Sequence, residues 1–126
     1  MPKKIVLDLE QDRELLNTTA KEWAEEIART KKTQVRNFYD KILELEERVK
    51  KEEQEENGSF SNVYPFIKML NSKVAYGVSR RVVSKEFQDM MEQCLNQITC
   101  DDNGKKKFEV FKLFFEAVLG FFKGRD

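Results

Sequence analysis

The stretch TQVRNFYDKILELEERV, residues 33–49, decides the fold of this chain. Its apolar residues recur at alternating steps of three and four positions, which is the spacing of one face of an α-helix. Thr33 can cap this helix, because a threonine hydroxyl accepts a hydrogen bond from a free amide of the first turn. A helix from Thr33 to about residue 56 has roughly 24 residues and a length of about 36 Å. The apolar positions are Val35, Phe38, Ile42, Leu45 and Val49.

The two ends of this long helix differ in character. Residues 50–56 are all charged or polar, which favours a solvated helix end over a projecting arm for a partner. The sequence Asn57-Gly58-Ser59 then predicts a stop. Before the long helix, Thr19 and Glu22 have the spacing of a capping box, so we expect a short helix over residues 19–29. Residues 1–17 stay undecided between an extended arm and a helical turn.

Two helices are predicted directly after the stop. The first begins at Ser59 or Ser61 and continues to about Val78, and Pro65 is tolerated in its first turn. Ser84 can cap the next helix, which continues to about Ile98.

The last predicted helix, residues 105–122, follows a turn at Asp101-Asp102-Asn103-Gly104. It is apolar over most of its circumference, which is typical of the central helix of a bundle or of a surface shared with another subunit. It carries six of the ten phenylalanines, namely Phe108, Phe111, Phe114, Phe115, Phe121 and Phe122.

These patterns predict an all-α fold, a bundle of about five helices that includes one long helix. The length of 126 residues fits a single helical domain over residues 1–126. Residues 1–17 then form either an arm or a first helical turn of that domain.

The composition excludes most enzyme classes. The chain has 23 Lys and Arg, 23 Asp and Glu, and no His. The lack of His excludes imidazole general bases, Ser-His nucleophiles and metal sites that need a His ligand. The sequence contains no Gly-rich phosphate loop and no GxSxG turn. We therefore expect no enzymatic activity, no cofactor, no metal and no small-molecule substrate.

Cysteine spacing and hydropathy predict where the protein resides. Cys94 and Cys100 lack the CxxC spacing of zinc and dithiol sites, so we expect both to be reduced and to serve packing. The N-terminal apolar run stops at Asp8, too early for a signal peptide. The longest apolar block, residues 114–122, contains Glu116 and is far shorter than the roughly 20 residues of a membrane span. We expect a cytoplasmic protein without membrane contact.

The charge distribution singles out one segment. Residues 57–85 contain no Asp or Glu. At about 100° per residue, Lys73, Tyr76 and Arg80 form a stripe opposite the predicted core face. Such a row suits the backbone of a nucleic acid, because cations neutralise phosphates and a tyrosine ring can stack on an unpaired base. It equally suits an ordinary solvated face whose cations pair with neighbouring carboxylates, and the stripe alone leaves both interpretations open.

Three segments together resemble the small subunit of the type III-A CRISPR effector, the Csm complex. They are TQVRNFYD at residues 33–40, SKVAYGVSR at residues 72–80 and FKLFFEAVLGFFK at residues 111–123. The first is similar to the family's Gln, apolar, Arg, x, Phe opening of its long helix. The second is similar to its Lys-x-x-Tyr-x-x-x-Arg helix, and the third to its C-terminal Phe-Glu-Ala helix.

The resemblance implies a non-catalytic, CRISPR-associated subunit of an antiviral ribonucleoprotein that stacks in several copies. Its implied partners are the guide RNA (crRNA), the target RNA, the other Csm subunits and copies of itself. The family motifs assign RNA contact to Arg36, Lys73, Tyr76 and Arg80. The acid-free segment adds the neighbouring cations Lys68, Arg81 and Lys85 to these RNA-binding candidates.

A second hypothesis belongs to a different class. The chain could be a helical protein-protein adaptor that docks a partner through its Phe-rich C-terminal helix and binds no RNA. The two hypotheses differ in what they require of the structure. The adaptor needs exposed phenylalanines, and the RNA contact needs Lys73 and Arg80 without carboxylate partners.

Overall fold

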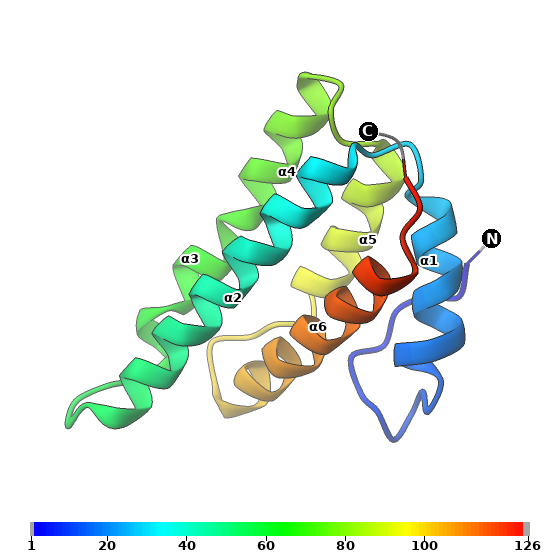
Figure 1. Cartoon of the computed structure of the whole chain (residues 1–126). Helices are drawn as coiled ribbons and strands as arrows, with labels where there is room; N and C mark the ends of the chain where they lie inside the picture. Colours follow the sequence, from blue (N-terminus) through cyan, green and yellow to red (C-terminus); the bar gives the residue numbers. More distant parts are fainter. Residues whose placement is uncertain (1, 125–126) are drawn as a thin grey trace.

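The computed structural model describes residues 2–124, and over these residues it is helical and has no strand (Figure 1). A π-helical turn over Leu15–Thr19 precedes the first α-helix, and a 3-10 turn over Phe60–Asn62 precedes the third. The predicted all-α class and the long helix are confirmed. The helices are α1 (Ala20–Glu26), α2 (Lys32–Gln54), α3 (Tyr64–Lys68), α4 (Leu70–Ser79), α5 (Lys85–Leu95) and α6 (Asp102–Phe121).

Helix α6 packs against both α1 and α2. Figure 1 shows α3 and α4 running antiparallel to α2, with α1 on the opposite side of the molecule. The phenylalanines of α6 are buried apart from Phe121, which is 36% exposed. The Phe-rich helix therefore contributes its phenylalanines to the core of the bundle and leaves one face, with Glu109, Leu113 and Glu116, exposed.

Aromatic rings join α6 to its neighbours. The Phe87 ring of α5 lies 5.2 Å from Phe38 of α2 and 6.1 Å from Phe115 of α6, centroid to centroid. Tyr39 of α2 stacks on Phe115, and its hydroxyl donates to Glu116 Oε1 over 2.8 Å. Burial and the Glu116 carboxylate raise the pKa of Tyr39 to about 12, so this hydroxyl stays a donor at neutral pH. Edge and offset contacts of this kind stabilise a core beyond the burial of their area.

The N-terminal segment is an extended arm. Ile5 and Leu7 are buried, and their backbone amides each donate to a glutamine side chain over 2.9 Å, Ile5 to Gln93 Oε1 of α5 and Leu7 to Gln97 Oε1 just after α5. Gln97 Nε2 in turn donates to the Ile5 carbonyl over 2.8 Å. The Trp23 indole donates to the carbonyl of Lys3 over 2.8 Å. Side chains thus satisfy backbone groups that have no strand partner.

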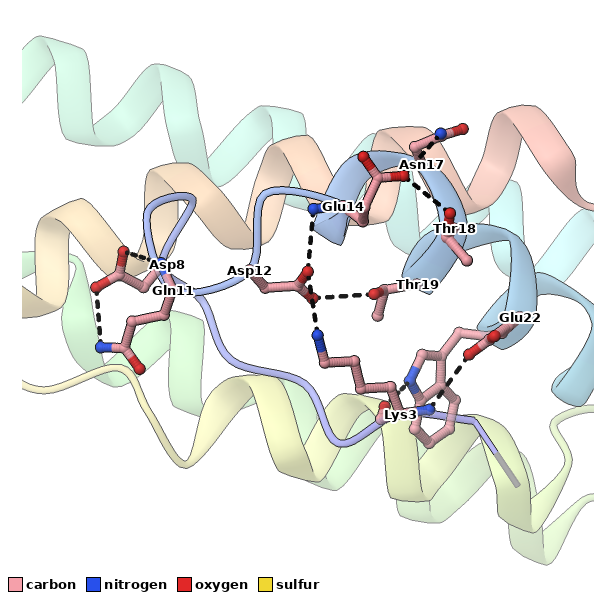
Figure 2. Close-up of polar contacts among 10 residues, drawn as sticks. Lys3, Asp8, Gln11, Asp12, Glu14, Asn17, Thr18, Thr19 and Glu22 are labelled. Atoms are coloured by element: carbon pink, nitrogen blue, oxygen red, sulfur yellow. Dashed lines mark hydrogen bonds and ion pairs between the residues drawn. The ribbon is translucent and has the colours of Figure 1, made fainter.

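Two predicted caps are wrong. Thr19 lies inside a helical turn with φ −63°, and its hydroxyl donates to Asp12 Oδ2 over 2.9 Å (Figure 2). The buried Asp12 carboxylate needs donors, and it takes the hydroxyl that would otherwise cap α1. Glu22 accepts from the backbone amide of Lys3 at 3.4 Å instead of closing a capping box. Thr33 lies within α2, whose N-cap position is Lys31.

The middle of the chain follows the prediction more closely. Ser84 caps α5, since its hydroxyl oxygen accepts from the Phe87 amide over 3.1 Å. The predicted helix over residues 59–78 is divided into the 3-10 turn, α3 and α4, and Met69 alone separates the two α-helices. Pro65 lies at the start of α3, where its missing amide proton is not needed.

The predicted turn at residues 101–104 is in fact the start of α6. Asp101 caps the helix, and its Oδ1 accepts from the Gly104 amide over 2.8 Å. A Cβ atom at Gly104 would lie 1.6 Å from the carbonyl oxygen of Thr99. Glycine is required here by close backbone contact and not by a turn.

The charged end of α2 is tied to its surroundings. Glu52 accepts from the Ser59 amide over 3.0 Å and from Asn62 Nδ2 over 2.7 Å, and Glu53 pairs with Lys105 of α6. Gly58 fits closely at this end, because an added Cβ would lie 1.7 Å from the Glu52 carbonyl oxygen. The stop after α2 is confirmed, and its last turn is not a free arm.

We expect Asp12→Asn to lower the free energy of unfolding by about 1–3 kcal/mol at neutral pH, because a buried charge-assisted hydrogen-bond acceptor is lost. Burial raises the pKa of Asp12, but hydrogen bonds from Thr19, the Glu14 amide and Lys3 outweigh it and leave the pKa below 3.8. The stabilisation is therefore present above pH 3.8 and disappears as the pH falls through the lowered pKa of the folded state. Urea denaturation against pH measures both effects.

Asp40→Asn, a charge-matched change at an exposed position of α2, is the control and should stay within about 0.5 kcal/mol of the parent protein. Equal stability of the parent and Asp12→Asn at neutral pH contradicts this account.

The two cysteines differ in accessibility. Both are free, but Cys94 is buried and Cys100 is exposed, so the packing role predicted for both is correct for Cys94 alone. Burial raises the pKa of the Cys94 thiol well above its ordinary value. We expect a chromogenic disulfide reagent to modify a single thiol quickly in the native protein and both thiols after denaturation. Cys100→Ser should abolish the fast phase, and a fast phase that persists contradicts the assignment.

Candidate nucleic-acid interface

The outer face of α4 presents Lys73, Tyr76 and Arg80, named here the α4 stripe. All three side chains are exposed, and Tyr76 is 64% exposed. The Arg80 guanidinium carbon lies 5.4 Å from the centroid of the Tyr76 ring. This contact holds a cation beside an open aromatic face. The opposite face of α4 enters the core through Leu70, Val74 and Gly77.

Over residues 2–124, no ion pair joins Lys73 or Arg80 to an acidic side chain. By contrast, Lys112 of α6 lies 3.2 Å from Glu116 and 3.9 Å from Glu46. The interpretation of the stripe as a paired, solvated face therefore has no support among the described contacts.

A shallow groove of about 290 Å³ separates the α4 stripe from α2. Lys73 and Tyr76 line one side, and Gln34, Asn37 and Lys41 line the other. The α2 residues add amide groups and the ammonium of Lys41, which lies 3.6 Å from Glu44 Oε1, to the lining of this groove. Sequence reasoning missed them, although their spacing of three and four positions places them together on one flank of the long helix.

Arg36 lies on another side of α2. At about 100° per residue it stands about 140° from Lys41, which lines the groove, and about 60° from Tyr39, which contacts α6. It is exposed, and no ion pair joins it to a carboxylate within the described part of the chain. The structure does not bring Arg36 into the α4 stripe.

Lys68 is not directed to solvent as the charge pattern suggested. Its ammonium donates to the backbone carbonyl of Leu95 and lies 5.5 Å from the centroid of the Tyr64 ring. Burial lowers the pKa of this group. Lys68 joins α3 to the end of α5, and it stands apart from the α4 stripe.

Arg81 and Lys85 lie beyond the C-terminus of α4 and are both exposed. The helix ends in a Schellman motif, in which the Arg81 amide donates to the Val78 carbonyl over 3.0 Å and the Val82 amide donates to the Gly77 carbonyl over 3.1 Å. Arg81 has φ 63° at the position where glycine is usual. That left-handed conformation costs a residue with a side chain roughly 1–2 kcal/mol.

The described residues include no metal centre. Within residues 2–124, no group of three or more Cys, Asp or Glu side chains is placed to hold a metal ion. The same part of the chain contains no helix that is long and apolar enough to span a membrane.

The chain is similar to a known protein family. A family model described as Csm2 Type III-A matches residues 10–125 of the chain. No curated protein and no solved structure matches it. The matched region covers nearly the whole chain, and it includes every helix of the bundle and all seven predicted RNA-binding residues.

Proposed function

The chain belongs to the Csm2 Type III-A family, and from this premise we propose that it contacts the RNA of the type III-A CRISPR effector through the α4 stripe. Membership makes it a small subunit of the Csm complex, with other Csm subunits as partners. The proposal adds that the strands contacted are the guide and the target RNA. It also adds that the subunit is cytoplasmic, assembles in several copies and leaves catalysis to other subunits.

The observation that carries this proposal is that, among the described residues, Lys73 and Arg80 have no carboxylate partner and lie beside the exposed Tyr76 ring. When an unpaired cation of the protein neutralises a phosphate, the counterions condensed on the RNA are released into solution. This release favours association with RNA. A tyrosine ring offers a face to any base, so the contact is independent of sequence. Phosphate contacts position a strand without reading it, and pairing between guide and target supplies the sequence recognition.

Copies of the subunit along one RNA strengthen a weak contact. The net charge of the whole chain is 0, so a single copy has little general attraction for RNA. Several linked copies convert later contacts into intramolecular ones, and the overall affinity then exceeds that of one copy. Binding is therefore best measured on the assembled complex.

The adaptor hypothesis requires an exposed Phe-rich surface on the C-terminal helix, and the structure has no such surface among the described residues. The phenylalanines proposed as a docking surface are buried, and Phe121 and Leu113 are the large apolar side chains of α6 that reach solvent, at 36% and 37% exposure. A pair of such residues is ordinary for a protein surface. No specific observation favours a second function over the RNA contact.

We expect Lys73→Ala combined with Arg80→Ala to weaken binding of target RNA by the assembled Csm complex and to leave the fold intact. The slope of log affinity against log salt should shrink by roughly 0.7 for each lost phosphate contact on a single strand. Fluorescence anisotropy over a salt series measures both quantities.

Lys21→Ala combined with Arg13→Ala is the matched control. It removes one lysine from α1 and one arginine from the segment before the π-helical turn, both at exposed positions. Figure 1 shows α1 on the opposite side of the molecule from α4. An unchanged salt slope in the α4 variant, or an equal change in the control, would falsify the assignment.

We expect Tyr76→Phe to bind RNA like the parent protein and Tyr76→Ala to bind it more weakly. A ring that stacks on a base contributes about 1–3 kcal/mol, and phenylalanine keeps the ring. Neither change should affect stability much, because the side chain is exposed. Equal affinity of all three proteins shows that no base stacks on Tyr76, and equal loss in both variants assigns the contact to the hydroxyl instead.

A further inference from the structure

A second cluster of cations surrounds a surface hollow at the turn between α4 and α5. Arg29, Arg81 and Lys85 line this hollow, together with the single carboxylate of Glu86. Within the described residues, no ion pair joins any of the three cations to a carboxylate. A hollow lined mainly by one sign of charge concentrates counterions.

Hydrogen bonds between distant parts of the chain position Arg29 beside the hollow. The hydroxyls of Thr30 and Ser84 lie 2.9 Å apart, and the Ser84 amide donates to Thr30 Oγ1 over 3.0 Å. The Lys31 amide donates to the Val82 carbonyl over 3.2 Å. Thr30 is fully buried. These bonds fix the α1–α2 turn against the α4–α5 turn, so Arg29 has a set position beside two residues more than fifty positions away.

Two of the three cations lie at backbone positions where their presence lowers the stability of the fold. Arg81 has the left-handed backbone of a Schellman motif, where glycine is the usual residue. Lys85 is the first residue of α5, and a positive charge there opposes the positive end of the helix dipole. Residues that weaken the fold locally are expected where their side chains serve a ligand.

We propose that Arg29, Arg81 and Lys85 hold a phosphate group of the RNA strand that the α4 stripe contacts. The inference rests on the proposed function and extends the interface beyond α4, since Arg81 directly follows Arg80 in the chain. Arginine forks donate paired hydrogen bonds to phosphate oxygens, and the lysine adds a point charge. Glu86 lies at the same hollow, and repulsion from its carboxylate favours a bound phosphate that lies toward the two arginines.

The decisive variant is Arg81→Gly. Glycine accepts the left-handed backbone, so this protein should be at least as stable as the parent while lacking the guanidinium. In the assembled Csm complex we expect roughly tenfold weaker RNA binding, the loss of one charge-assisted contact, and a salt slope smaller by about 0.7. Arg29→Ala should give the same loss, and Arg81→Lys should lose less because it keeps the charge.

Comparison with the α4 variant separates the two proposals. If Lys73→Ala with Arg80→Ala weakens binding and Arg81→Gly and Arg29→Ala do not, the phosphate site is refuted and the proposed function stands. If the hollow variants alone weaken binding, the α4 assignment fails and the phosphate site stands as the RNA contact. If neither set has an effect, both are refuted.

Thermal denaturation in the presence of inorganic phosphate is the last test of this proposal. Its addition should raise the melting temperature of the parent no more than that of Arg81→Gly, because a single exposed anion gains little without its strand. If phosphate stabilises the parent selectively while RNA affinity is the same in both proteins, the hollow binds a free anion and the RNA assignment is overturned.

Discussion

Burial of the α6 phenylalanines is the constraint on which the rest of the structure depends. Most of the circumference of the helix is apolar and is covered by contacts with α1, α2 and α5, while one face that includes Glu109, Leu113 and Glu116 stays exposed. The Phe87 ring of α5 links Phe38 and Phe115 and thereby sets the distance between α2 and α6. Removing one such ring from a packed core typically costs about 3–5 kcal/mol, a large share of the stability of a small domain.

The functional surface is what this packing leaves uncovered. Over residues 2–124, helix α4 gives one face to the core and has no carboxylate partner on the other, and residues 57–85 contain no acid. Glu46 lies within reach of Lys112, and Glu53 pairs with Lys105, both on α6. A chain with zero net charge thus acquires a cationic side through the placement of its ion pairs.

The sequence predicted a helix cap correctly where no distant residue competed for the hydrogen bond of the capping side chain. Ser84 caps α5 as expected, since its hydroxyl oxygen is near the first free amides of the helix. Thr19 does not cap α1, because the buried Asp12 carboxylate lies in reach of its hydroxyl. Gln93 of α5 and Gln97 just after it likewise hold the backbone of an arm whose conformation was undecided from sequence. Contacts between residues distant in the chain override local propensity in each of these cases.

The amino-acid sequence by itself determined the helical class, the long helix, the core positions and the outward direction of Lys73, Tyr76 and Arg80. Helical period fixes these, because it sets where each side chain points around its own axis. Only the tertiary structure decided that Lys68 turns to the Leu95 carbonyl, that Arg36 stands apart, and that Arg29 joins Arg81. Those outcomes depend on how one helix or turn is placed against another, and packing and long-range hydrogen bonds set that placement.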